Sequence, residues 1–163
     1  MTDANERRLA QMIVVDRQRG RVLLGLHKSG PWEDFYTGLL DEVHAGEGPA
    51  AAAVRIALEQ AGIVISHCEH LATFRFSSDA WEPANEFEFL AESHTGEPRE
   101  SAALRPEWFS IDEIPYRKMP ADDALWYPAF LARKPMKGYF NFAEDGVTLL
   151  SHAIEEVDAI ETI

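Results

Sequence analysis

The chain has 163 residues, of which 46% are hydrophobic, a size and composition that suit one domain with its own core. Its 15 basic residues are outnumbered by 28 acidic ones, and the net charge of -13 argues against nucleic acid as a partner because phosphate backbones would be repelled. Cys68 is the only cysteine, so no disulfide can form within the chain. Neither a run of about 18 apolar residues nor an apolar leader is found, so we expect no membrane span and a cytoplasmic location.

The first part of the sequence predicts a β-hairpin. Apolar and β-branched residues over 9–15 and 21–26 flank a polar turn, 16–20, that ends in glycine. This pattern is typical of two antiparallel strands joined by a short connection. The stretch that follows, 38–44, is short and mixed in character.

An alanine-rich run predicts a helix over 49–61. Pro49 suits the first turn of a helix, and the residues after it are strong helix formers. Gly62 stands just past the end of the run, where glycine usually stops a helix. We expect Ala53, Ala57 and Ala61 to face the interior of the protein.

The remainder of the chain predicts further strands and a second helix. The expected elements are strands over 63–76 and 86–91 separated by a loop over 77–85, a short strand over 107–111, a helix over 121–132 that must accommodate Pro128, a hairpin of 138–142 with 147–152, and a candidate helix from Ala153. This order predicts an α/β (α+β) fold in which a mixed β-sheet is sandwiched between helices.

Several segments carry a resemblance to a known family. They are Arg21–Gly25, Gly46–Glu47, Arg105–Phe109, Asp122–Pro128 and Gly138–Phe142. In order and spacing they resemble the Nudix hydrolase superfamily, and within it the MutT-like branch that acts on oxidised purine nucleoside triphosphates. The resemblance covers roughly residues 21–157, and it implies a single Nudix domain over 1–163.

The motif that defines this family, G-x5-E-x7-R-E-U-x-E-E-x-G-U with U a bulky aliphatic residue, is only partly present. The matching residues are Glu47, Arg55, Glu59, Gly62 and Ile63, and the departures are Asp41, Ile56, Ala57 and Gln60. In the family, three glutamates at i, i+3 and i+4 lie on one helix face and bind Mg²⁺, which neutralises the diphosphate and orients water. A further metal ligand of the family would fall at Ala103.

The resemblance therefore implies candidate catalytic residues at Glu47, Arg55, Glu59 and Gln60, with Glu47 and Arg55 as the structural pair. Of four expected metal carboxylates only Glu59 remains. Losing even one such group commonly costs on the order of a hundred- to thousandfold in rate, so Mg²⁺ binding should be weak or absent, with Mn²⁺ as an alternative. The sequence predicts that restoring two carboxylates, by Ile56→Glu with Gln60→Glu, raises metal-dependent hydrolysis by more than about tenfold.

Other interpretations of these acids remain open. Asp41 and Glu42 are extra acids near the helix that could replace lost metal ligands, or they could form a solvated strand or loop edge. Glu59 could bind metal or form an i, i+4 ion pair with Arg55.

The residues that would contact a purine base are better retained. Asp122 and Asp123 match an acidic pair that reads the purine edge in this branch, and adjacent carboxyls in an apolar pocket can share a proton and so offer both donor and acceptor. Helix capping is the alternative role. By resemblance, Phe76 and Trp126 would line the pocket, although either could belong to the core.

Three further positions of the base site have changed. Thr37 stands where the family has an asparagine that contacts the base, and His27 stands where it has a lysine. Pro120 replaces a stacking tryptophan. The ligand preference is therefore expected to differ from that of the family.

Three functions remain compatible with the sequence. The first is a protein that binds a small purine nucleotide, with weak or lost pyrophosphohydrolase activity. The second is an active Mg²⁺-dependent nucleoside triphosphate pyrophosphohydrolase with a rearranged metal site. The third is a partner-binding module, and the sequence leaves the oligomeric state open.

Overall fold

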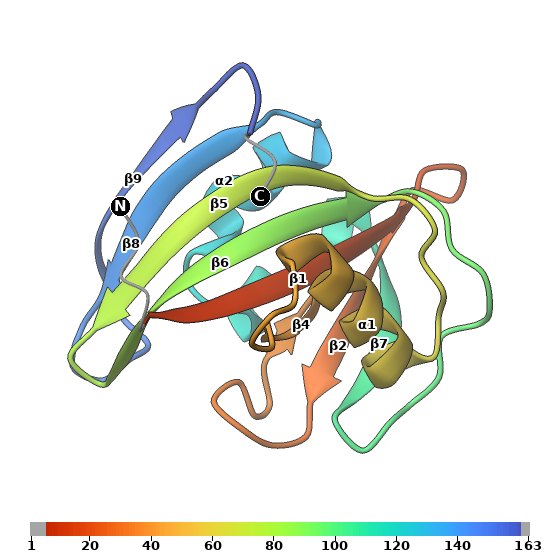
Figure 1. Cartoon of the computed structure of the whole chain (residues 1–163), viewed down its shortest axis with the longest axis horizontal. Helices are drawn as coiled ribbons and strands as arrows, with labels where there is room; N and C mark the ends of the chain where they lie inside the picture. Colours follow the sequence, from red (N-terminus) through yellow and green to blue (C-terminus); the bar gives the residue numbers. More distant parts are fainter. Residues whose placement is uncertain (1–5, 161–163) are drawn as a thin grey trace.

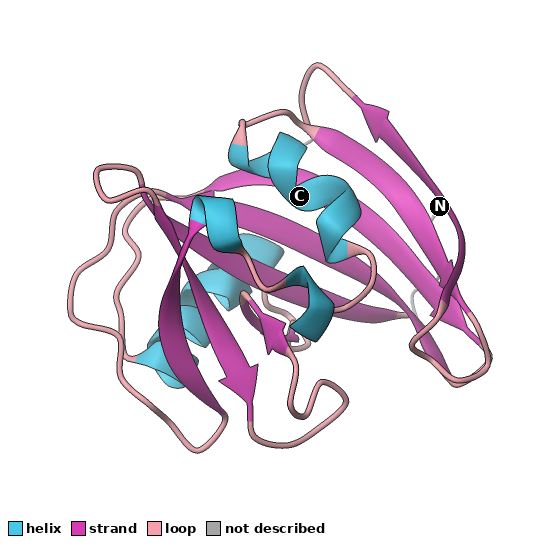
Figure 2. Ribbon diagram, turned by 180° about the vertical axis from the view of Figure 1, so that it is seen from behind, coloured by secondary structure: helices cyan, strands magenta, loops and turns pink. Residues whose placement is uncertain are grey.

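A mixed β-sheet with one helix on each face forms the centre of the protein (Figures 1 and 2). The computed structural model describes residues 6–160. The elements are β1 (Arg7–Asp16), β2 (Arg21–His27), β3 (Tyr36–Thr37), β4 (Leu39–Glu42), α1 (Pro49–Ala61), β5 (Glu69–Ser78), β6 (Trp81–Ala91), β7 (Leu104–Ser110), the 3-10 turns η1 (Ile111–Glu113) and η2 (Tyr116–Lys118), α2 (Asp123–Leu131), β8 (Met136–Phe142) and β9 (Leu149–Glu156). The predicted α+β sandwich is confirmed.

The first strand, β1, is the hub of the sheet. Within the part of the chain that the structure describes, nine strands run in the order β3-β2-β1-β6-β5-β8-β9, with β4 paired to β1 and β7 to β2. One edge of β1 pairs antiparallel with β4 and then with β2, while its other edge pairs in parallel with β6. Because both edges and both faces of β1 are covered, residues 9–15 are all buried.

Helix α1 packs against one face of the sheet, as the sequence predicts. Its buried residues recur with helical spacing and include Ala53, Ala57 and Ala61. These small side chains allow a close approach to the sheet. Gly62 ends the helix in the left-handed conformation, with φ of 68°, which glycine adopts without steric cost.

Helix α2 covers the opposite face of the sheet, together with the two 3-10 turns (Figure 2). It begins two residues later than the sequence predicts and includes Pro128. Trp126, Tyr127 and Phe130 are fully buried, and the Trp126 ring lies 5.1 Å from that of Phe74 on β5. Aromatic packing therefore fixes α2 on the sheet.

Two expectations about β5 were wrong. The predicted loop over 77–85 is instead a tight hairpin, since β5 continues to Ser78 and β6 begins at Trp81. Pro83 is tolerated because it lies beside a bulge in the pairing with β5 and before the first residue paired with β1. The strand expected from Ile63 begins only at Glu69, and Val64 makes just an isolated bridge to Thr95.

The C-terminal expectation was also wrong. Residues from Ala153, a candidate helix in the sequence, continue β9 as far as Glu156. Their pairing with β8 supplies hydrogen bonds along an otherwise open sheet edge, and this tertiary context overrides local helix propensity. In the described range 6–160, no helix is long and apolar enough to cross a membrane.

Candidate functional site

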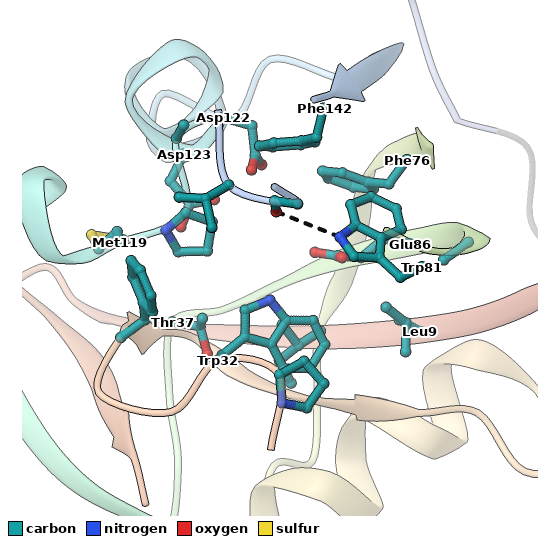
Figure 3. A pocket seen from close by; sticks show the side chains of 18 of the residues that line it. Leu9, Trp32, Thr37, Phe76, Trp81, Glu86, Met119, Asp122, Asp123 and Phe142 are labelled. Carbon is teal, nitrogen blue, oxygen red and sulfur yellow. Dashed lines mark hydrogen bonds between the residues drawn. The ribbon is translucent and has the colours of Figure 1, made fainter. Parts of the chain in front are cut away.

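A cleft of about 650 Å³ opens on the α2 side of the sheet (Figure 3). Its walls come from strands β1, β5 and β6, the loop before β3, the segment between η2 and α2, and the turn between β8 and β9. The aromatic residues that line it are Trp32, Phe35, Phe76, Trp81, Tyr116 and Phe142. Its volume is in the range of small-molecule sites, and its aromatic walls suit a flat ring system.

The acidic pair at the start of α2 lies at the inner end of this cleft. Asp122 and Asp123 line it and are each 3% exposed. Asp122 makes no side-chain capping hydrogen bond, and its Oδ2 instead accepts the indole N–H of Trp126 at 2.9 Å. The capping interpretation is therefore wrong for Asp122. Asp123 Oδ2 is buried and has no hydrogen-bond partner among the described residues.

A second acidic pair, on β6, was not identified from the sequence. Glu86 is 7% exposed and lines the cleft, and Glu88 is fully buried behind it. Gln11 on β1 donates from Nε2 to Glu88 Oε2 at 2.6 Å and to Glu86 Oε1 at 3.3 Å. The alternation of glutamate and phenylalanine over 86–89 is typical of a strand with one solvated face, but α2 covers that face here.

Burial shifts the ionisation of all four carboxyls. It raises the pKa of Glu86 to about 7, and the charge of Asp122 adds to the effect. Burial also raises the pKa of Glu88 well above its usual range, with the charge of Glu86 adding to this. The pKa of Asp122 is raised by burial, and that of Asp123 is raised well above its usual range by burial and by the charge of Asp122. In both pairs the two close carboxyls thus titrate as a unit, and each pair keeps a proton to higher pH than an isolated carboxyl would.

Thr37 and His27, two of the three altered base-site positions, contact each other. His27 Nε2 lies 2.6 Å from Thr37 Oγ1, and the Thr37 hydroxyl donates to the carbonyl of Gly38 at 2.6 Å. Because that hydroxyl has a single proton, His27 must donate from Nε2. Burial lowers the pKa of His27 to about 4, so the ring is neutral at pH 7. Thr37 lines the cleft, whereas His27 lies behind it.

The two aromatic candidates differ in position. Phe76 lines the cleft. Trp126 is fully buried under Asp122 and does not line the cleft, so the structure places it in the core, the alternative that the sequence left open.

On the other face of the sheet, the motif's structural pair is intact. Arg55 donates from Nε and Nη2 to the two carboxylate oxygens of Glu47, at 2.8 and 2.9 Å. This bidentate contact lowers the pKa of Glu47 to about 2. Arg55 also forms an ion pair with Glu59, with Nη1 3.0 Å from Oε2. The Glu59 side chain is 54% exposed.

The positions that would hold metal do not fit a divalent cation. The Gln60 amide is committed to the backbone of Leu40, and Ile56 is fully buried in the core under α1. Asp41 and Glu42 are exposed on β4, and Glu42 Oε1 pairs with Arg7 Nε at 2.9 Å. Between residues 6 and 160, no group of three or more His, Cys, Asp or Glu side chains is arranged to hold a metal ion. A hard cation such as Mg²⁺ needs more oxygen ligands than Glu59 alone provides.

The sheet, the two helices and the retained Glu47–Arg55 pair define a Nudix-type domain, and sequence comparison agrees. The model of the NUDIX domain matches residues 6–130, so the chain belongs to the Nudix family. The chain is 37% identical over 147 residues to the oxidized purine nucleoside triphosphate hydrolase of Danio rerio, which covers 90% of this chain and 94% of that protein. It is 32% identical over 148 residues to the Mus musculus protein of the same name, with the same coverage.

Structural comparison gives the same fold. A MutT protein from Bacillus halodurans has a TM-score of 0.79 at 24% identity, covering 91% of this chain and 97% of that one. At this identity the likeness establishes the fold alone. Sequence comparison thus confirms the predicted family, and structural comparison confirms the predicted fold.

Proposed function

We propose that this Nudix protein binds a purine nucleotide in the cleft on the α2 face and hydrolyses it weakly or not at all. Asp123 carries the proposal, because its buried and unpartnered oxygen lies in a cleft with aromatic walls. A base that hydrogen-bonds to this carboxyl would satisfy a group that is otherwise costly to bury. The named activity of the Danio rerio relative, on oxidized purine nucleoside triphosphates, supports a purine as the ligand.

The state of the metal positions supports the proposal of weak hydrolysis. Ile56 is buried in the core, and the buried Gln60 side chain is hydrogen-bonded to the backbone of Leu40. Glu59 forms an ion pair with Arg55. Without a metal cluster, little remains to neutralise the phosphate charge or activate water. A cytoplasmic location and a lack of nucleic-acid or membrane partners remain predictions from composition and charge.

The second candidate is an active Mg²⁺-dependent pyrophosphohydrolase with a rearranged metal site. The 37% identity with the Danio rerio enzyme favours it, and the exposed acids Asp41 and Glu42 are its available metal ligands.

Calorimetry and an activity assay separate these functions. Purine nucleoside mono- and triphosphates, including 8-oxo-guanine forms, are titrated with Mg²⁺, with Mn²⁺ and with a chelator, while pyrophosphate release is measured on the same samples. We expect binding that persists in the chelator, and turnover far below the ordinary enzyme rate of about 10 per second. Turnover near that ordinary rate would favour the second candidate, and no binding at all would favour a partner-binding module.

Asp123→Asn tests the site itself. The amide cannot share a proton with Asp122 in the same way, so we expect affinity for purine nucleotides to fall at least about tenfold, or ~1.4 kcal/mol. Asp112→Asn, at an exposed position on η1, is the matched control and should bind like the unaltered protein. Unchanged affinity in Asp123→Asn would contradict base binding by the acidic pair.

A further inference from the structure

The inner end of the cleft holds four carboxyls without a cation to offset them. Glu86 and Glu88 come from β6, Asp122 and Asp123 come from α2, and each is at most 7% exposed. The two pairs are close enough to influence each other, since the charge of Asp122 raises the pKa of Glu86, that of Asp123 raises the pKa of Glu88, and that of Glu86 raises the pKa of Asp123. Within residues 6–160, no arginine or lysine makes a hydrogen bond or ion pair with any of them, and their protein donors are the Gln11 amide and the Trp126 indole.

Two of these groups have oxygens that lack a hydrogen-bond partner in the described part of the chain. They are Asp123 Oδ2, at the cleft, and Glu88 Oε1, behind Glu86. A buried carboxyl without a partner is costly, and the cost falls if a ligand brings donors or positive charge to it. An acidic pair alone would suffice to read the donors of a neutral purine. The additional glutamates supply more acceptor oxygens than a neutral base needs, and a positive charge beside them would favour their ionised form.

The walls of the cleft favour positive charge as well. Figure 3 shows Trp32, Trp81 and Phe76 around the same cleft as Glu86. The faces of aromatic rings attract cations, tryptophan most strongly, and cages of aromatic rings recognise alkylated cations. At the outer rim, the exposed Arg117 also lines the cleft and is available to a phosphate group.

We propose that the cleft selects a purine nucleotide whose base carries a positive charge, such as an N7-methylated guanine or an N1-methylated adenine, and that Glu86 determines this preference. The inference rests on the proposed function, because it assigns a base class to the same cleft. The delocalised charge of the base would lie between the aromatic walls, with its N–H donors toward the carboxyls. The phosphate would lie toward Arg117.

Two matched ligand pairs test the inference by calorimetry at neutral pH. N7-methyl-GMP is compared with GMP, and N1-methyl-AMP with AMP, so that each pair differs by one methyl group and one positive charge. We expect the charged member of both pairs to bind at least about tenfold more tightly, which is ~1.4 kcal/mol. Equal affinity, tighter binding of the neutral members, or a preference in one pair only would overturn the inference while leaving purine binding intact. No binding of any of the four nucleotides would overturn the proposed function too.

Glu86→Gln tests whether Glu86 determines the preference for a positively charged base. It keeps the shape of the side chain and removes its ability to carry a negative charge, so the charged and the neutral member of each ligand pair should bind the variant equally well. Glu82→Gln, at an exposed position on the same strand, is the control and should keep the preference. A Glu86→Gln protein that folds, as checked by thermal unfolding, and keeps the full preference would contradict the role of Glu86. If that variant fails to fold, the comparison of the two ligand pairs in the unaltered protein decides the inference.

Discussion

The side chain of Gln60 on α1 is hydrogen-bonded at both ends of its amide to the backbone of one residue, Leu40 on β4. Gln60 Oε1 accepts from the Leu40 N–H at 3.1 Å, and Nε2 donates to the Leu40 carbonyl at 2.9 Å. Leu40 also lines the cleft. The amide thus ties the Nudix helix to a wall of the proposed nucleotide site, at a position where the family motif has a carboxylate.

Gln60→Glu is therefore expected to destabilise the protein. The substitution removes the Nε2 donor and sets a carboxylate against the Leu40 carbonyl oxygen, so the free energy of unfolding should fall by about 1 to 3 kcal/mol. Urea unfolding followed by circular dichroism measures this. Gln18→Glu, the same substitution in the exposed turn after β1, should change stability by less than about 0.5 kcal/mol. Equal stability of the two variants would show that the two hydrogen bonds contribute little.

For the double change Ile56→Glu with Gln60→Glu, the structure leads to a different expected outcome from the one that the sequence motif predicts. The motif alone predicts a gain in hydrolysis, but Ile56 is fully buried among apolar side chains. A charge placed there without a partner costs about 3 to 5 kcal/mol, a large part of the stability of a typical domain. We expect partial unfolding and no gain in Mg²⁺-dependent pyrophosphate release. A folded double variant with more than about tenfold higher turnover would instead support the sequence-based prediction.

Ala57→Leu tests the close packing of α1 on the sheet. Ala57 is fully buried, so a larger side chain must displace its neighbours, and we expect a loss of about 1 to 3 kcal/mol in the free energy of unfolding. Ala51→Leu makes the same substitution on the exposed face of the same helix. Its stability should stay within about 0.5 kcal/mol of the unaltered protein. If both variants unfold at the same urea concentration, the helix packs less tightly than the structure indicates.

Glu86 makes the stability of the protein depend on pH. Its pKa is about 7 in the folded protein and 4.5 as its ordinary value, so the folded state retains a proton that the unfolded state releases between these values. The contribution of Glu86 is thus fully present below 4.5 and is lost as the pH rises through about 7. Glu88, Asp122 and Asp123 act in the same direction.

The lowered pKa of His27 acts in the opposite direction, between about 4 and 6.5, so a comparison of variants is needed. Relative to the unaltered protein, Glu86→Gln should gain stability as the pH rises from about 5 to about 8, measured by urea unfolding at both values. Glu82→Gln should follow the unaltered protein at both. A constant difference between Glu86→Gln and the unaltered protein would contradict the raised pKa.

The sequence predicts the parts of the protein that local rules govern. The α1 boundaries follow from Pro49, the alanines and Gly62, and the first hairpin follows from its turn. The burial of Asp122 and Asp123 was anticipated through the family resemblance. Glu86 and Glu88 could not be found in this way, because their alternation with phenylalanine indicates a solvated face unless the position of α2 is known. Likewise, the hairpin of β5 and β6 depends on a bulge beside Pro83 that no local pattern encodes.

The final hairpin, β8 and β9, lies beyond residue 130, where the match to the family ends. Even so, Phe142 and the turn residues Asp145, Gly146 and Val147 line the cleft, and the Gly146 carbonyl accepts the indole N–H of Trp81 at 3.5 Å. One wall of the pocket is thus built by a segment that the shared Nudix sequence pattern does not include. Changes in this turn could alter which base is accepted while the motif helix stays constant, so related proteins with the same motif can diverge in ligand through the segment beyond the family match.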